Sequence, residues 1–194
     1  NFEVLVKDKN FSTYWFLNNY KIIGSFLPIN QNETFNYLEI GSFEGLSSLF
    51  ILSYWKNANV TCVDTWETSK DDSQFLDFNF QTVEKKFDTN LKDFSFRKIK
   101  STSEIAFKQL KQTESFDYIY IDGSHNGIDI YNDALASFNI LKVGGIIIFD
   151  DITNIYQDIE FQPHDAFEKF YSVYKRKFKI LYLKNIAVIK KTNY

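Results

Sequence analysis

The sequence predicts an α/β fold with a doubly wound, mostly parallel sheet of seven strands that ends in an antiparallel hairpin. Three observations lead to this fold class. Apolar runs of strand length alternate with segments of helical composition, which indicates a parallel sheet covered by helices on both faces. The runs "YIYI" and "GIIIF" are almost continuously apolar, as is typical of strands buried on both sides. Only Lys184 and Asn185 separate the last two runs, so no crossover helix fits between them.

The predicted strands are short runs rich in β-branched and aromatic residues. They are Phe35–Ile40, Val60–Val63, Phe94–Ile99, Phe116–Ile121, Ile146–Phe149, Phe178–Leu183 and Ile186–Ile189. Helical spacing or helix-forming composition lies between the first five, in Leu46–Trp55, Ser103–Leu110 and Ile128–Leu141. Because the last two runs form a hairpin, one of them must run antiparallel.

Two segments lie outside this alternation. The N-terminal stretch "STYWFLNNYKIIGSFL" is predicted to be an aromatic amphipathic helix whose rings pack on the core. The stretch Thr65–Asp93 is too long for a simple connection, so it is either a loop that closes over a ligand or a surface helix with an exposed loop. We expect one domain over residues 1–194, with 1–34 as a helical extension and 35–194 as the core.

Composition limits the possible functions. The chain has 194 residues, 44% of them hydrophobic and 24% charged, which suits one globular domain, and its net charge of −3 argues against a nucleic-acid partner. Because Cys62 is the single cysteine and His125 and His164 are the two histidines, a disulfide and a Cys- or His-rich metal cluster are excluded. His164 follows Pro163 at an expected helix start, and we interpret it as structural. No apolar run reaches the length of a membrane span and no signal peptide opens the chain, so a cytoplasmic protein is expected.

Acidic residues stand where the predicted strands end. Glu39 closes the first strand, Asp64 follows the second, Asp122 the fourth, and Asp150 and Asp151 the fifth. The carboxyl ends of parallel strands meet at one edge of the sheet, where ligands bind. Burying so many like charges close together is costly unless cations, hydroxyls or amines face them.

The first strand leads into the glycine turn "EIGSFEG". Gly41 and Gly45 permit a tight connection and let a ligand approach the backbone, and the helix that follows would point its first amides, with Ser47, at an anionic group such as a carboxylate. A dinucleotide site would require glycine where Phe43 stands, so nicotinamide and flavin dinucleotides are disfavoured. Asp64 follows at the interval at which nucleotide folds place an acid on ribose hydroxyls, although a solvated strand-end acid is the alternative.

Four stretches together carry a family resemblance. "YLEIGSFEGLSS", "VTCVDTW", "FDYIYIDGSH" and "LKVGGIIIFDD" resemble the class I S-adenosylmethionine-dependent methyltransferases, which have a Rossmann-like seven-stranded sheet with an antiparallel last strand. The sequence is most similar to the small-molecule O-methyltransferase branch that includes metal-dependent sugar enzymes, such as macrocin O-methyltransferases, and catechol O-methyltransferases. The resemblance extends from about Phe35 to the C-terminus, with the motifs in the family's order and spacing.

The resemblance implies a cofactor site for S-adenosylmethionine. Glu39, Gly41 and Ser47 would hold the methionine moiety and Asp64 the ribose, while the adenine would lie near Trp66 and the "KSTSE" turn. This sequence lacks the family's usual Gly-Asp-Ser at that turn. The predicted cofactor-binding residues are Glu39, Gly41, Ser42, Gly45, Ser47, Asp64, Trp66, Ser101, Thr102, Ser103 and Asp122.

A second group of residues predicts a metal and a base. Asp122, Asp150 and Asp151 offer oxygen ligands, which suit Mg²⁺ or another divalent cation. By the resemblance they would bind such a metal, and Asp122 and His125 would be catalytic, with His125 as the base. A metal lowers the pKa of a substrate hydroxyl, and a neutral imidazole can take its proton. Alternatively, His125 caps the helix that starts near Asn126, and the two adjacent acids begin a loop without a metal.

The sequence therefore favours an S-adenosylmethionine-dependent O-methyltransferase, assisted by Mg²⁺, that acts on a hydroxyl of a small molecule or sugar. No nucleic acid and no membrane is expected as a partner, and the oligomeric state is open, with a homodimer as one possibility. One alternative is a metal-independent methyltransferase with a different acceptor atom. Another is a catalytically silent S-adenosylmethionine-binding module that serves as an interaction domain. Loops choose the acceptor, so the sequence does not identify it.

Overall fold

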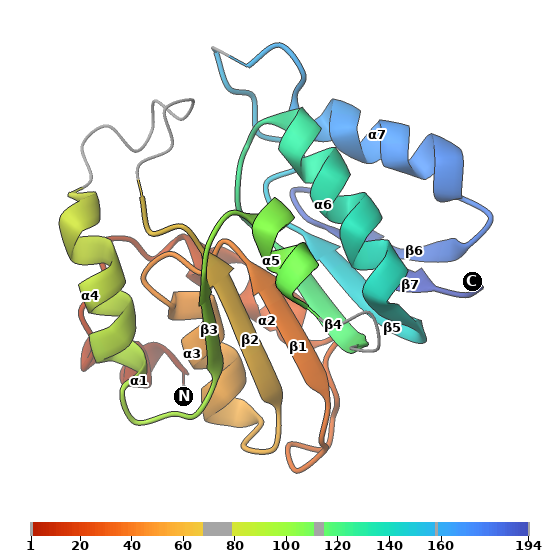
Figure 1. The fold of residues 1–194 in the computed structure, drawn as a ribbon. Helices are drawn as coiled ribbons and strands as arrows, with labels where there is room; N and C mark the ends of the chain where they lie inside the picture. Colours follow the sequence, from red (N-terminus) through yellow and green to blue (C-terminus); the bar gives the residue numbers. More distant parts are fainter. Residues whose placement is uncertain (1, 68–78, 111–114, 158, 194) are drawn as a thin grey trace.

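The structure, a computed structural model, describes residues 2–67, 79–110, 115–157 and 159–193. These residues form a seven-stranded sheet with the strand order β3-β2-β1-β4-β5-β7-β6 (Figure 1). The strands are β1 Asn36–Ile40, β2 Asn59–Asp64, β3 Arg97–Lys100, β4 Phe116–Ile121, β5 Leu141–Phe149, β6 Phe178–Leu183 and β7 Ala187–Lys191. The first five are parallel to one another, and β7 pairs antiparallel with both β5 and β6. The predicted fold class, including the terminal hairpin, is confirmed.

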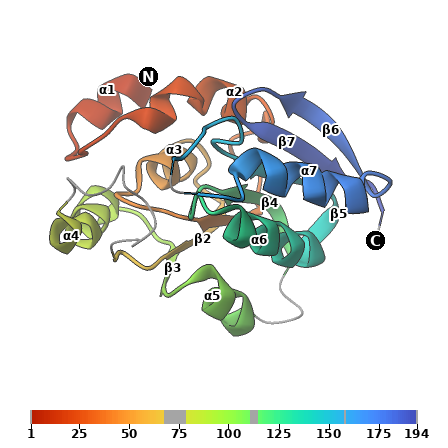
Figure 2. The ribbon, with the colours of Figure 1, turned by 90° about the horizontal axis from the view of Figure 1, so that it is seen from above.

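Helices cover both faces of this sheet (Figure 2). One face carries α1 Phe2–Lys7, α2 Tyr20–Gly24, α3 Leu46–Tyr54 and α4 Phe80–Leu91, and the other carries α5 Ser103–Gln109, α6 Gly127–Ile140 and α7 Pro163–Tyr174. The strands alternate between two apolar cores, because successive side chains point to opposite faces: Tyr120 and Ile148 belong to the first core, whereas Ile119 and Ile147 belong to the second. The helices predicted at Leu46–Trp55, Ser103–Leu110 and Ile128–Leu141 end within one residue of the observed α3, α5 and α6.

Two strands, β3 and β5, begin more than one residue away from their predicted starts. β3 begins at Arg97 rather than Phe94, because the Phe94 amide still donates to the Leu91 carbonyl at the end of α4 (2.9 Å). β5 begins at Leu141 rather than Ile146, and its register against β4 shifts between Phe116 and Tyr118.

The N-terminal segment corrects one prediction. The stretch from Ser12 to Leu27 is not a single helix but a 3-10 turn, η1 Trp15–Asn18, followed by the short α2, and α1 precedes them. The break lies at Asn19, whose amide side chain bonds to residues of the sheet rim instead of facing solvent along a helix. The rings do pack on the core, where Phe16 and Tyr20 contact Phe50 at 5.7 and 5.6 Å between centroids.

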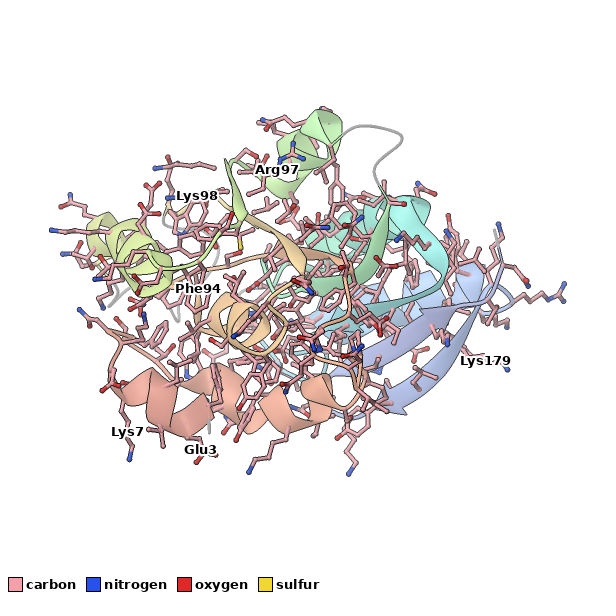
Figure 3. The ribbon with its side chains drawn as sticks, turned by 90° about the horizontal axis from the view of Figure 1, so that it is seen from below. Glu3, Lys7, Phe94, Arg97, Lys98 and Lys179 are labelled. Atoms are coloured by element: carbon pink, nitrogen blue, oxygen red, sulfur yellow. The ribbon has the colours of Figure 1, made fainter. Side chains whose placement is uncertain are left out.

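The face of α1 that points away from the sheet carries Glu3, Val4 and Lys7, all of them exposed. Glu3 and Lys7 project outward from it (Figure 3), whereas Phe2 and Val6 are buried against the core. None of the described helices is long and apolar enough to cross a membrane.

The stretch Thr65–Asp93 contains a surface helix. α4 is amphipathic and buries Val83, Phe87 and Leu91 against the first core, while its remaining face is largely exposed. Residues 68–78 lie outside the described part of the chain, so the expectation of a closing loop there stays a prediction.

Candidate active site

A cavity of about 400 Å³ opens where the strands end, between the N-terminal segment and the carboxyl ends of β1, β4 and β5. The N-terminal segment provides one wall and the strand ends provide the other. The described residues that line it are Thr13, Trp15, Phe16, Asn18, Asn19, Gly41, Ser42, Phe43, Glu44, Leu46, Ser47, Asp122, Gly123, His125, Asp150, Asp151, Asn154 and Asn185. This set contains four acids and neither Lys nor Arg, so the lining favours a cationic ligand.

The glycine turn forms the floor of the cavity. Gly41 has a φ of 89°, and a Cβ on it would lie 2.0 Å from the carbonyl oxygen of Asp122, so only glycine fits between β1 and β4. Gly45 has a φ of 84° and immediately precedes α3. Phe43 also adopts a positive φ, 44°, which is strained for a residue with a ring. This strained loop brings its backbone to the cavity, as functional turns often do.

Glu39 is fully buried beneath this turn. Its carboxylate accepts hydrogen bonds from the hydroxyls of Ser47 and Ser48, the latter at 2.6 Å. Burial raises the pKa of Glu39 to about 7, and the two serine hydroxyls oppose that shift. The hydroxyl of Ser42, also buried and on the cavity lining, has no hydrogen-bond partner among the described residues, which is the mark of a group that a ligand could satisfy.

Asp64 holds the neighbouring loop together. Its carboxylate accepts from the backbone amides of Phe43 (2.8 Å) and Trp66 (2.6 Å), and burial raises its pKa against these bonds. Trp66 is buried, its indole N–H donates to the Phe43 carbonyl at 2.8 Å, and its ring packs against Phe87 and under Lys98. The Trp66 ring therefore already has packing partners within the fold, and Trp66 is not among the described residues that line the cavity.

The "KSTSE" turn lies at the end of β3. The Ser101 amide donates to the Asp64 carbonyl at 2.9 Å, so this turn adjoins the Asp64 loop. The Thr102 hydroxyl caps α5 by accepting from the Ile105 amide, and Ser103 is the first residue of that helix. Among the predicted cofactor-binding residues, Gly41, Ser42, Ser47 and Asp122 line the cavity formed by the described residues. All of the cofactor-binding assignments, including these four, stay predictions.

Three acids converge at the other end of the cavity. The strand ladder continues through the Asp122 amide, which donates to Ile40, and the Asp150 amide, which donates to Ile121, so both acids stand side by side. The buried hydroxyl of Tyr120 donates to Asp150 Oδ2 and approaches Asp122 Oδ2 at 3.2 Å. Burial and the negative charges of its neighbours raise the pKa of Asp122 well above its ordinary value and that of Asp150 to about 6.

His125 faces the third acid. Its Nε2 lies 3.6 Å from Asp151 Oδ2, and its ring, 8% exposed, stacks on Tyr156 at 4.5 Å between centroids. The potential ligand atoms of Asp122, His125 and Asp151 all lie within 4.8 Å of one another. Asp151 has a φ of 53°, an uncommon conformation that the surrounding bonds maintain. The donor set suits a hard divalent cation, because carboxylate oxygens dominate it.

One alternative left open by the sequence is resolved. The side chain that caps α6 is Asn126, which accepts from the Ile128 amide at 2.9 Å, so His125 is not the cap. Lys142, which precedes the buried part of β5, pairs with Asp117 at 2.8 Å at the other end of the sheet from the three acids.

The sequence reasoning missed three site residues. Tyr120 lies two residues before Asp122 on the same strand, so strand periodicity could have identified it. Glu44, 2% exposed, accepts from Ser12 and Lys86, and Asn19 bonds to Asp150. No local pattern marks these last two, because their partners are distant in sequence.

Comparison with known proteins gives a family. The family model described as a methyltransferase domain matches residues 38–152, a range that contains every predicted site residue. A curated relative, the uncharacterized protein R132 of Acanthamoeba polyphaga mimivirus, is 27% identical over 134 residues, which cover 69% of this chain and 57% of the viral protein.

Solved structures share the fold. The MycE methyltransferase of the mycinamycin biosynthetic pathway, in complex with Mg, SAH and mycinamycin VI, has a TM-score of 0.64 and 16% identity, with 99% of this chain and 54% of MycE covered. The O-methyltransferase NovP has a TM-score of 0.58 and 15% identity, with 90% of this chain and 76% of NovP covered. An O-methyltransferase from Bacillus cereus in complex with SAH also has a TM-score of 0.58 and 15% identity, with 96% of this chain and 95% of that enzyme covered. The chain thus spans little more than half the length of the viral relative and of MycE.

Proposed function

Because the chain belongs to the methyltransferase-domain family, matched over residues 38–152, we propose that it transfers a methyl group from S-adenosylmethionine to a hydroxyl of a small molecule or sugar. The observation that carries this proposal is the meeting of Asp122, His125 and Asp151 in one cavity with the glycine turn. A methyl donor held over the turn would face the acids and the imidazole, which is the arrangement that proton removal and methyl transfer require.

The cofactor end suits a cationic ligand. S-adenosylmethionine carries a sulfonium and an ammonium, and Asp122 and the other acids of the cavity lining would face these cationic groups from the opposite end of the cavity. Buried Glu39 and the orphaned hydroxyl of Ser42 are suited to the methionine moiety, together with Gly41, Gly45 and Ser47. A pyrophosphate would instead meet like charges, which disfavours a dinucleotide.

The acceptor end suits a divalent cation. Asp122, Asp150 and Asp151 would hold Mg²⁺ or a similar ion, and such an ion would lower the pKa of a substrate hydroxyl. His125 would take the hydroxyl proton on Nε2, while Tyr156 stacks on its ring and fixes the plane. The imidazole is largely buried, which limits its contact with bulk water, and it lines the cavity in which an acceptor would lie.

The partners follow from the same features. The MycE methyltransferase is seen in complex with Mg, SAH and mycinamycin VI, which supports a small-molecule acceptor here. The net charge of −3 favours neither nucleic acid nor an acidic membrane surface, and a cytoplasmic location fits this proposal. Both a monomer and a homodimer remain compatible with it. The alternatives are a metal-independent methyltransferase with another acceptor atom and a silent cofactor-binding module.

Calorimetry and methyl transfer together test the proposal. We expect S-adenosylhomocysteine to bind with or without a chelator, and labelled methyl to pass from S-adenosylmethionine to vicinal-diol sugars or catechols only when Mg²⁺ is present. His125→Ala should lower turnover by a factor of about 100 or more, since it removes the base, without weakening S-adenosylhomocysteine binding.

Each alternative has its own outcome. Full transfer in excess chelator would establish the metal-independent reading. Cofactor binding with no transfer to any acceptor, even at millimolar concentrations, would favour the silent module. No heat with either sulfur ligand would exclude the cofactor itself.

A further inference from the structure

One buried amide joins the N-terminal segment to the acceptor end of the cavity. Asn19, 7% exposed, donates from Nδ2 to Asp150 Oδ1 at 3.2 Å and accepts at Oδ1 from Asn185 Nδ2 at 2.8 Å. These partners lie 131 and 166 residues further along the chain. α2, which follows Asn19 directly, lies on the first face of the sheet, on the side where β7 and β6 follow β5 (Figure 2). Asn19 is therefore a contact between three distant segments, not a local feature of its own turn.

The orientation of this amide is fixed from both sides. Because Asn185 donates to the Asn19 carbonyl oxygen, the Asn19 NH₂ group must face Asp150. The backbone is fixed as well, since the Asn19 amide donates to Phe16 at 3.0 Å and its carbonyl accepts from Ile23 at 2.9 Å. A side chain bound at both polar atoms on an immobilised backbone holds its partner in one geometry.

The oxygens of Asp150 are then unequal. Oδ1 accepts two hydrogen bonds, from Asn19 and from the Asp151 amide at 2.8 Å, which matches its two lone pairs. Oδ2 accepts one hydrogen bond from the described residues, that of Tyr120. One lone pair of Oδ2 therefore remains, on the oxygen that shares the Tyr120 hydroxyl with Asp122.

We propose that Asn19 is a positioning residue that holds Asp150 so that Oδ2 alone is presented to a divalent cation shared with Asp122 and Asp151. This inference rests on the proposed metal-assisted function. Partners behind metal ligands orient them and strengthen binding, typically by a factor of about 10 to 100. Without Asn19, the Asp150 carboxylate can rotate about its Cβ–Cγ bond, and Oδ2 loses its fixed direction.

Asn185 extends the same control to the second member of the acidic pair. Its carbonyl accepts from the Ile152 amide at 3.0 Å, directly after Asp151. The left-handed backbone of Asp151 is thus held at the following residue by the same asparagine that orients Asn19. Loss of the Asn185 side chain would remove the hydrogen bond that orients Asn19. It would keep the hydrogen bond to the Ile152 amide, because that carbonyl belongs to the backbone.

The test compares two buried asparagines. Asn19→Leu keeps the side-chain volume and removes both hydrogen bonds. Asn90→Leu is the matched control: Asn90 is 1% exposed and also ties the N-terminal segment to the domain, through Asn10 and the Glu44 carbonyl, without touching Asp150. Mn²⁺ serves as the probe, and its free concentration is measured by electron paramagnetic resonance, with folding checked by circular dichroism. We expect Asn19→Leu to raise the Kd for Mn²⁺ by a factor of about 10 or more, and Asn90→Leu to change it less than about twofold.

The outcomes separate this inference from the proposed function. A folded Asn19→Leu protein that binds Mn²⁺ as tightly as the wild type would overturn the positioning role while the metal site stands. Wild-type protein that binds S-adenosylhomocysteine but no Mn²⁺ would refute both the metal and its positioning residue. If Asn19→Leu does not fold, Asn185→Ala decides, with a smaller rise in Kd expected and an unchanged Kd refuting the inference.

Discussion

The two ends of the cavity hold their acids in opposite ways. At the β1 and β2 end, the chain supplies hydrogen-bond donors for each carboxylate: Glu39 receives two serine hydroxyls and Asp64 receives two backbone amides. At the β4 and β5 end, Asp150 accepts hydrogen bonds from Asn19, Tyr120 and the Asp151 amide, and Asp122 shares the Tyr120 phenol. Asp151 has His125 and the Tyr156 hydroxyl nearby at 3.6 and 3.4 Å. Donors are present at both ends, but at the second end the negative charges of Asp150 and Asp151 also raise the pKa of Asp122.

This difference distinguishes acids that stabilise the fold from acids that are placed to bind a cation. Acids that are satisfied by the chain keep a loop in shape, so their removal should damage the fold. Acids that repel one another destabilise the fold when no cation is bound, so their removal should raise the free energy of unfolding of the ligand-free protein. The same residue type thus has opposite expected effects on stability at the two ends.

The largest expected effect is that of pH on the ligand-free protein. Burial raises the pKa of Glu39 from 4.5 to about 7, so between these values the folded state binds a proton that the unfolded state does not. The free energy of unfolding should therefore be greatest near pH 5 and fall as pH rises through 7, with on the order of 3 kcal/mol from Glu39 alone. Urea unfolding between pH 5 and 8.5 in the presence of a chelator measures this change.

Two variants assign the pH effect to its sources. Asp133, a buried acid of α6, also has a pKa raised by burial to about 7, and Asp133→Asn removes its share. In the Asp133→Asn variant, the further change Glu39→Gln should make the free energy of unfolding depend still less on pH. The dependence that remains is then the contribution of Asp122 and Asp150. Stability that rises from pH 5 to 8 would show that the buried acids are charged and well paired in the folded state, and would contradict the raised pKa from which this pH effect is expected.

The next effect in size concerns Asp64. Asp64→Ala leaves the amides of Phe43 and Trp66 without their acceptor, and both residues have positive φ angles, 44° and 49°. We expect a loss of about 2 to 4 kcal/mol in the free energy of unfolding, together with weaker binding of S-adenosylhomocysteine. Urea unfolding and calorimetry measure the two.

Asp64→Asn is the control for this variant. Its amide keeps one acceptor oxygen at nearly the same volume, so it should lose about half as much stability. An Asp64→Ala protein that unfolds at the wild-type urea concentration would mean that the carboxylate serves the ligand alone and does not support the loop.

Much of the fold follows from the sequence because its signals are local. Strands buried on both faces need continuous apolar runs, and β4 and β5 have them. Two strands joined by so short a connection can only run antiparallel, as β6 and β7 do. The single N-terminal helix was wrong because the preference of a helix-spaced segment was overridden at Asn19 by partners more than a hundred residues away.

The same distinction applies to the site. Parallel strands bring their carboxyl ends together, so the convergence of Asp122, Asp150 and Asp151 could be predicted from their positions alone. The hydrogen bonds that make their environments unequal could not, because they depend on how the N-terminal segment and the β6–β7 turn pack against the rim. The part of the cavity wall formed by Thr13, Trp15 and Phe16 could not be predicted either, because it depends on the same packing of the N-terminal segment.

The smallest effect gives the most direct test of the comparison, because its sign is opposite to that at Asp64. Asp151→Asn removes one of three converging charges while keeping the side-chain shape, and asparagine tolerates the left-handed φ of 53° better than most residues. Since the charge of Asp151 raises the pKa of both Asp122 and Asp150, its loss should stabilise the metal-free protein by about 1 kcal/mol at pH 8. With Mg²⁺ present, the wild type should gain stability by binding the ion and the variant should not. Urea unfolding of the wild type and of Asp151→Asn, each with chelator and with Mg²⁺, gives the four free energies of unfolding that this comparison needs. If Asp151→Asn is instead less stable than the wild type in chelator, then Asp151 is held by hydrogen bonds as Asp64 is, and the two ends of the cavity are built alike.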